Sequence, residues 1–121
     1  MKKIMIVDDQ PEVRELVNIT LSSEEYQILQ TDTGEKAIKM AKLEKPDLIL
    51  MDIMMPGSID GLEAARTIKS HPDIKDTFII MLTAKGQKAE IQKGFEAGVN
   101  DYFVKPFSPL KLINKVEEIL K

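Results

Sequence analysis

The chain has 121 residues and a formal net charge of −3 at pH 7, and 43% of its residues are hydrophobic while 31% are charged. This length and composition suit one folded globular domain rather than a disordered chain. The sequence has no cysteine for disulfides or thiolate metal sites, no long basic run for nucleic acid, and an opening apolar run, IMIV, too short for a signal peptide or membrane span. We therefore expect one cytoplasmic domain over residues 1–121, with no output domain and no direct nucleic-acid or membrane partner.

Apolar runs without polar alternation predict strands that are covered on both faces, as in a parallel sheet. In chain order they lie at residues 4–7, 26–29, 48–51, 78–82 and 102–104. Each run is followed by a segment in which apolar residues recur at helical spacing. These segments lie at residues 13–21, 37–41, 62–68, 91–95 and 112–120. The chain therefore divides into five strand–helix units.

Residues at the expected helix ends agree with this division. Pro11 suits a first helical turn, Ser108 and Pro109 form an N-cap and first-turn pair, and Gly98 stands where a left-handed C-cap is expected. Alternating strands and helices predict an α/β fold with right-handed crossovers, and five units are too few for an eight-stranded barrel. We predict an open, doubly wound, five-stranded parallel sheet of the flavodoxin-like (βα)5 type, with helices on both faces.

Polar residues follow the predicted strands at their carboxyl ends. They are Asp8 and Asp9 after the first strand, Asp52 after the third, Thr83 after the fourth and Lys105 after the fifth. Each one alone has a common structural explanation, since Asp and Thr stop strands and cap helices, and a lysine before a proline suits a surface turn. Together they mark the edge at which open α/β sheets bind ligands.

The strand order 2-1-3-4-5, one of the two common doubly wound orders, would bring these residues within reach of one another. It places Asp9 and Asp52 on neighbouring strands, about 5 Å apart. Three crowded acids raise each other's pKa unless a positive charge joins them, and magnesium suits carboxylate and phosphate oxygens. Thr83 would be one strand from Asp52, whereas Lys105 would be two strands, or about 10 Å, away and would need its long stem. A carboxylate facing a divalent cation, a hydroxyl and an ammonium is well placed to form an aspartyl phosphate.

At these positions the sequence resembles the receiver domain of two-component response regulators, of the stand-alone chemotaxis type. The resemblance covers essentially the whole chain through the motifs IMIVDDQ, DLILMDIMMP, DG, MLTA and DYFVKPF. It implies that Asp52 accepts a phosphoryl group from the phosphohistidine of a sensor histidine kinase or a phosphotransferase. It also implies a site for Mg²⁺, or Mn²⁺ in its place, formed by Asp9, Asp52 and the backbone carbonyl of Met54, with Asp8 acting through water.

The resemblance further implies a conformational switch. Thr83 would move toward the new phosphoryl oxygen, Ala84 and Lys105 would also bind the phosphoryl group, and Tyr102 would turn inward. The peptide bond between Lys105 and Pro106 is expected to be cis. A downstream protein target would read the surface of the fourth helix, the fifth strand and the fifth helix, in a monomer or a weak phosphorylation-dependent dimer.

The loop after the third strand departs from the family pattern. Residues 57–59 place three residues between Pro56 and Asp60, where the family usually has two. Met54 and Lys85 stand at positions that tune hydrolysis of the phosphoryl group in this family. We hypothesise that Met54, which cannot hydrogen-bond an attacking water, slows autodephosphorylation.

Two other classes of protein stay open at this point. A haloacid-dehalogenase-type phosphatase also uses an aspartyl phosphate, but its motif has Asp-x-Asp after the first strand, whereas Asp8 and Asp9 are adjacent. The second class is a docking scaffold that has lost phosphorylation, and the complete set of acids with Thr83 and Lys105 argues against it. We expect a phosphoacceptor that assists its own phosphorylation and slow dephosphorylation, not a turnover enzyme.

Overall fold

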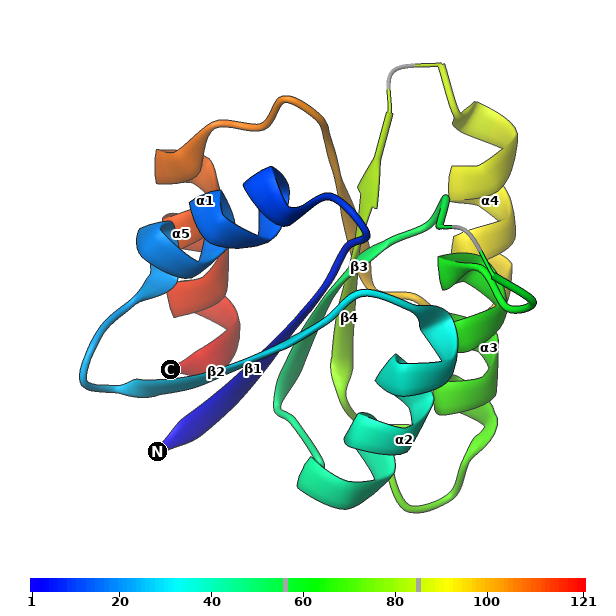
Figure 1. The fold of residues 1–121 in the computed structure, drawn as a ribbon, viewed down its shortest axis with the longest axis horizontal. Coiled ribbons are helices and arrows are strands. Elements are labelled where there is room, and N and C mark those ends of the chain that lie inside the picture. The colour runs from blue at the N-terminus through cyan, green and yellow to red at the C-terminus, as the bar shows by residue number, and fades with distance from the viewer. Residues whose placement is uncertain (56, 85) are drawn as a thin grey trace.

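Five parallel strands form one sheet between two layers of helices (Figure 1). The computed structural model describes residues 1–55, 57–84 and 86–121. The strands are β1 (Lys2–Val7), β2 (Tyr26–Thr31), β3 (Leu48–Asp52), β4 (Phe78–Thr83) and β5 (Asp101–Val104), and the helices are α1 (Pro11–Leu21), α2 (Gly34–Glu44), α3 (Gly61–Ser70), α4 (Lys88–Glu96) and α5 (Pro109–Leu120). The strand order is β2-β1-β3-β4-β5. The predicted doubly wound sheet is therefore confirmed, and each strand is slightly longer than its apolar run.

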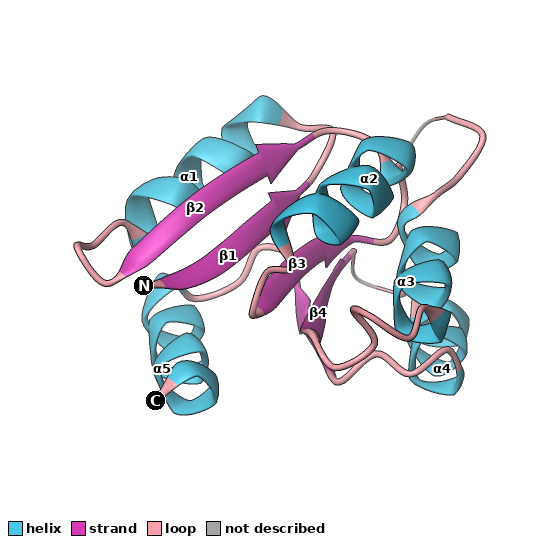
Figure 2. Ribbon diagram, turned by 90° about the horizontal axis from the view of Figure 1, so that it is seen from below, coloured by secondary structure: helices cyan, strands magenta, loops and turns pink. Residues whose placement is uncertain are grey.

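The two faces of the sheet pack against different helices, which explains why the strand sequences do not alternate. Successive side chains of a strand point to opposite faces. In β1, Ile4 and Ile6 pack in one core with residues of α1 and α5, whereas Met5 and Val7 pack in the other with residues of α2 and α3. Figure 2 shows α1 and α2 on opposite sides of the sheet. Every residue of β3 is buried, so LILMD is apolar on both faces until its final Asp52.

The helices are short, and the ends that the sequence predicts are confirmed. Helix α1 begins at Pro11, α5 has Ser108 as its N-cap, and Gly98 follows α4 with a left-handed φ of +103°. The Ser108 hydroxyl oxygen accepts a hydrogen bond from the Lys111 N–H at 3.3 Å. Among the described residues, none of the helices combines the length and the hydropathy that crossing a bilayer requires.

Candidate functional site

The register of the strands sets the polar residues at one edge of the sheet. Val7, Met51 and Met81 pair across β1, β3 and β4. The residues that follow Val7 and Met51, Asp8 and Asp52, therefore lie at the same level, and the end of β4 lies beside them. The carboxyl ends of the parallel strands meet at this edge, where open α/β sheets bind ligands.

Three carboxylates form a cluster at this edge. Asp8, Asp9 and Asp52 each have a carboxylate oxygen within 4.8 Å of those of the other two. Asp8 is fully buried and Asp52 is 6% exposed, while Asp9 is partly exposed. Backbone amides fix two of them, because Asp8 Oδ1 accepts from the Gln10 N–H at 2.9 Å and Asp52 Oδ1 accepts from the Met54 N–H at 3.2 Å. Asp8 and Asp52 are therefore each held by the turn that follows their own strand.

Lys105 reaches two of these acids at once. Its ammonium nitrogen lies 2.7 Å from Asp8 Oδ2 and 3.4 Å from Asp52 Oδ2. Sequence reasoning assigned Lys105 to Asp52 and gave Asp8 only a role toward the metal ion, yet the shorter contact is to Asp8. The physical reason is burial, since a fully buried carboxylate without a counter-charge is costly. One lysine is thus shared by two carboxylates.

The electrostatics of the cluster leave excess negative charge. Burial first, and the neighbouring charge of Asp8 second, raise the pKa of Asp52 from 3.8 to about 7, even though the Lys105 ammonium works in the opposite direction. One ammonium cannot balance three acids, and their hard oxygen atoms are the ligands that Mg²⁺ prefers. The donor set, its spacing and its unbalanced charge therefore fit a divalent cation.

The connection between β3 and α3 is packed tightly behind Asp52. A Cβ atom added at Gly61 would overlap the backbone carbonyl of Asp52, so only glycine fits at the start of α3. Asp60 caps this helix by accepting a hydrogen bond from the Glu63 N–H at 2.9 Å.

The loop of residues 57–59 in this connection packs against the start of α2. A Cβ atom added at Gly34, the first residue of α2, would lie 2.6 Å from the Ile59 carbonyl oxygen. Gly57 has a φ of +113° and lies next to the Glu35 carboxylate. Residues 57–59 are thus accommodated against the start of α2, while Pro56, at which the departure from the family pattern begins, lies outside the described residues.

Two hydrogen-bond donors at the end of β4, the Thr83 hydroxyl and the Ala84 N–H, already have acceptors within the protein. The Thr83 hydroxyl donates to the Phe103 carbonyl oxygen at 3.3 Å, and the Ala84 N–H donates to Gln87 Oε1 at 2.6 Å. Sequence reasoning missed Gln87. Glutamine is not a favoured N-cap residue, so the local sequence gives no signal for this contact.

The remaining predicted residues lie around this edge. Tyr102 is 40% exposed, and its ring packs edge-on against Phe95 with ring centroids 6.0 Å apart. The Lys105–Pro106 peptide bond is cis. Met54 is 56% exposed. Lys85, the other position assigned to tuning hydrolysis, lies outside the described residues.

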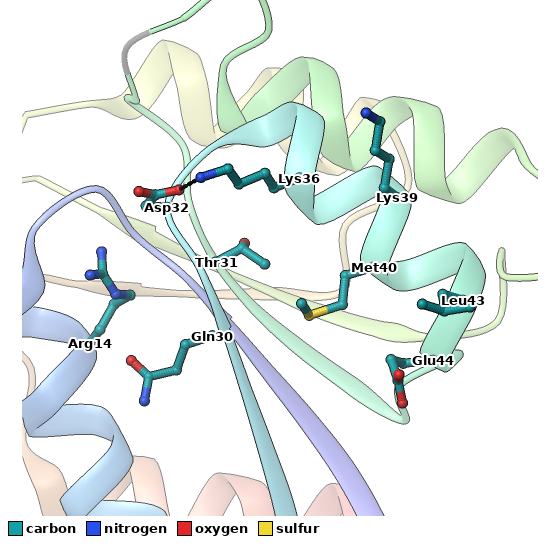
Figure 3. A pocket seen from close by; sticks show the side chains of 9 residues that line it. All are labelled: Arg14, Gln30, Thr31, Asp32, Lys36, Lys39, Met40, Leu43 and Glu44. Atoms are coloured by element: carbon teal, nitrogen blue, oxygen red, sulfur yellow. Dashed lines mark hydrogen bonds and ion pairs between the residues drawn. The ribbon is translucent and has the colours of Figure 1, made fainter.

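A groove of about 550 Å³ lies beside this edge, over the end of β2 and along α2 (Figure 3). It is lined by Arg14, Gln30, Thr31, Asp32, Lys36, Lys39, Met40, Leu43 and Glu44. Lys36 and Asp32 form an ion pair across its upper end at 3.0 Å. None of the three clustered acids lines it, although Arg14 also donates to the backbone carbonyl of Asp8 at 2.6 Å. The groove is therefore separate from the acidic cluster.

Comparison with known proteins assigns the class of protein that this fold and site define. The sequence model of the response regulator receiver domain matches residues 4–117. The chain belongs to this family, and the resemblance noted from its motifs is confirmed.

Individual relatives agree with this assignment. The chain is 45% identical to the transcriptional regulatory protein ResD of Bacillus subtilis (strain 168) over 98% of its own length and 48% of that protein. It is 40% identical to the phosphate regulon transcriptional regulatory protein PhoB of Pseudomonas aeruginosa over 99% of its length and 52% of that protein. The chain thus spans about half the length of these curated relatives.

Solved structures share the fold over the whole chain. The chemotaxis response regulator CheY4 of Vibrio cholerae has a TM-score of 0.89 at 30% identity, with 99% of each chain covered. A BeF3-activated DrrB receiver domain has a TM-score of 0.86 at 32% identity, with 99% of this chain and 97% of that chain covered. The chain is similar to receiver domains both in sequence and in the arrangement of all five strands.

Proposed function

We propose that the chain is a phosphoacceptor switch and that Asp52 takes a phosphoryl group from the phosphohistidine of a sensor histidine kinase or a phosphotransferase. The observation that carries this proposal is the shared contact of Lys105 with Asp8 and Asp52 beside a third acid at the carboxyl edge of the sheet. A carboxylate oxygen of Asp52 forms the new O–P bond while the P–N bond to the donor imidazole breaks. The imidazole nitrogen keeps that electron pair and takes up a proton from water.

The acidic cluster supports a metal requirement for this transfer. Asp9, Asp52 and the backbone carbonyl of Met54 would hold Mg²⁺, or Mn²⁺ in its place, with Asp8 acting through water. Bound Mg²⁺ would neutralise charge on the acids and on the phosphoryl oxygens. Lys105 would then turn from its carboxylate partners toward the phosphoryl group, as a cation already held 3.4 Å from Asp52.

Phosphorylation would favour a second conformation. The Thr83 hydroxyl, the Ala84 N–H and Lys105 would bind phosphoryl oxygens, and Tyr102 would leave its exposed position beside Phe95 and turn inward. A bias of about 5.5 kcal/mol moves a two-state population from rare to dominant. The changed surface of α4, β5 and α5 would be read by a downstream protein target, in a monomer or a weak phosphorylation-dependent dimer.

The biological setting of this switch rests on expectations from the sequence. A cytoplasmic receiver that acts without direct contact to nucleic acid or membrane stays a prediction, as does the single-domain organisation. ResD and PhoB are transcriptional regulatory proteins, and the chain covers about half of each. A connection from this receiver to transcription is accordingly a second candidate for its output.

Phosphoryl labelling tests the proposal. Incubation with acetyl phosphate and Mg²⁺ should add one phosphoryl group to the intact mass of the chain, and a chelator should prevent it. Asp52→Asn should abolish labelling, whereas the matched change at an exposed acid, Asp73→Asn, should leave it intact. Labelling of Asp52→Asn at the unchanged level would refute the acceptor. Steady turnover of p-nitrophenyl phosphate would favour a phosphatase instead.

A further inference from the structure

The Ala84 N–H at the end of β4 is occupied by a side chain from the start of α4. It donates to Gln87 Oε1 at 2.6 Å. Gln87 is the N-cap residue of α4, but its side chain makes no capping bond to that helix. It bonds back to the residue that follows β4. Gln87 therefore connects the end of the strand to the start of the helix.

This bond lies at the edge that carries the acids. Asp52 pairs with Leu82 in the sheet, so Thr83 and Ala84 extend β4 just beyond the level of Asp52. The Thr83 hydroxyl is likewise occupied, because it donates to the Phe103 carbonyl oxygen. Under the proposed function, a phosphoryl group on Asp52 would meet, at Ala84, a donor that already has an acceptor.

A phosphoryl oxygen is a better acceptor for this N–H than a carboxamide. Hydrogen bonds to ionised acceptors are roughly twice as strong as bonds between neutral groups. One N–H makes one strong hydrogen bond, so the two acceptors exclude each other. The bond between Ala84 and Gln87 is exposed, so a displaced Gln87 side chain can turn out into water.

We propose that Gln87 is an internal competitor of the phosphoryl group: it holds the Ala84 N–H in the unphosphorylated chain and is displaced when Asp52 is phosphorylated. This inference rests on the proposed function. Displacement frees the residue directly before Lys88, so the exchange of acceptors acts on the first turn of α4. Gln87 is a positioning residue, since it acts through the Ala84 N–H.

Beryllofluoride binding with Mg²⁺ tests this competition in the whole chain, because beryllofluoride takes the place of the phosphoryl group on a carboxylate. Gln87→Met keeps the length of the side chain but removes the acceptor, and it should bind beryllofluoride roughly three- to tenfold more tightly. Gln87→Glu keeps an acceptor and adds a negative charge, so it should bind more weakly than the unchanged chain. Gln92→Met makes the same substitution at an exposed position of α4 and should change nothing.

The opposite directions of the two Gln87 variants separate competition from a structural role, which would weaken binding in both. The Ala84 amide proton should also shift upfield in Gln87→Met before any ligand is added, because its hydrogen bond is lost. Equal dissociation constants for Gln87→Met and the unchanged chain would overturn the inference. Failure of the unchanged chain to bind beryllofluoride would overturn the proposed function, and the inference with it.

Discussion

The connections that follow β3 and β4 differ in how they are held. Behind Asp52, the described residues of the β3–α3 connection are fixed by backbone contacts of Gly61, by the Asp60 cap and by the contact with α2. After Thr83, the described residues of the β4–α4 connection are exposed or half-buried, and the Gln87 side chain ties them to the strand. Asp52, the proposed nucleophile, thus sits in a rigid frame, while the connection that we propose responds to phosphorylation is held by an exchangeable hydrogen bond.

The largest difference in stability should appear between two glycine substitutions, one in each connection. Gly61→Ala places a methyl group against the Asp52 backbone and should lower the free energy of unfolding by about 3 kcal/mol. Gly86→Ala has free space and should lose only about 1 kcal/mol from its positive φ. Urea unfolding measures both. Equal losses would contradict the contrast in packing.

Magnesium should stabilise the chain in a pH-dependent way. Because the pKa of Asp52 is raised, the metal-free folded state keeps the Asp52 proton up to about pH 7. The unfolded state loses this proton near the ordinary pKa of 3.8. This contribution to stability is fully present below pH 3.8 and is lost as the pH rises through about 7. Because Mg²⁺ binds ionised carboxylates, its stabilising effect should be larger at pH 8 than at pH 5, and about 2.7 kcal/mol at 100 times its dissociation constant.

Thermal unfolding with and without Mg²⁺ at the two pH values measures this effect. Asp52→Asn, which cannot ionise, should lose most of the difference between them. A shift in Tm that is the same at both pH values in the unchanged chain would contradict the assignment of excess charge to the acidic cluster.

A smaller effect is expected from the two N-cap positions. Asp60→Ala removes the bond to the Glu63 N–H and should lower the free energy of unfolding by about 1 kcal/mol, whereas Asp60→Asn retains an acceptor and should lose less. Gln87→Ala, at the N-cap of α4, should change it by no more than about 0.5 kcal/mol because its side chain caps nothing. Denaturation midpoints in urea give the comparison. A larger loss for Gln87→Ala than for Asp60→Ala would reverse the proposed roles.

The smallest effect concerns the lifetime of the phosphorylated state. Met54→Asn introduces a side chain that can hydrogen-bond an attacking water, and it should speed loss of the phosphoryl group by roughly fivefold, the equivalent of one hydrogen bond. The intact mass, followed over time after removal of the donor, measures this rate. An unchanged rate would remove Met54 as a cause of slow dephosphorylation.

The sequence predicts the fold well because each of its main signals is local. Uninterrupted apolar runs such as 48–51, between turn-forming residues, are typical of strands covered on both faces. The carboxyl-edge positions of Asp8, Asp52 and Lys105 follow from the strand order, which the sequence reasoning took from a common pattern.

The contacts within the site could not be predicted in the same way. The preference of Lys105 for Asp8 depends on which carboxylate is more deeply buried, and burial is set by the packing of the whole edge. The bond from Ala84 to Gln87 depends on the rotamer of one side chain. The placement of residues 57–59 depends on their contact with Gly34, which is distant in the sequence. The first and third features are tertiary and the second depends on one rotamer, so none of them leaves a pattern in the local sequence.

We propose that Asp52 is a phosphoacceptor held in a rigid frame and that the β4–α4 connection changes conformation when Asp52 is phosphorylated. Amide NMR spectra of the chain with Mg²⁺, before and after addition of beryllofluoride, test it most directly. We predict large shifts at Thr83, Ala84 and the first turn of α4, small shifts in the first turn of α3, and no change in Asp52→Asn. Shifts in α3 as large as those in α4, or an unmoved Ala84 amide, would contradict the account.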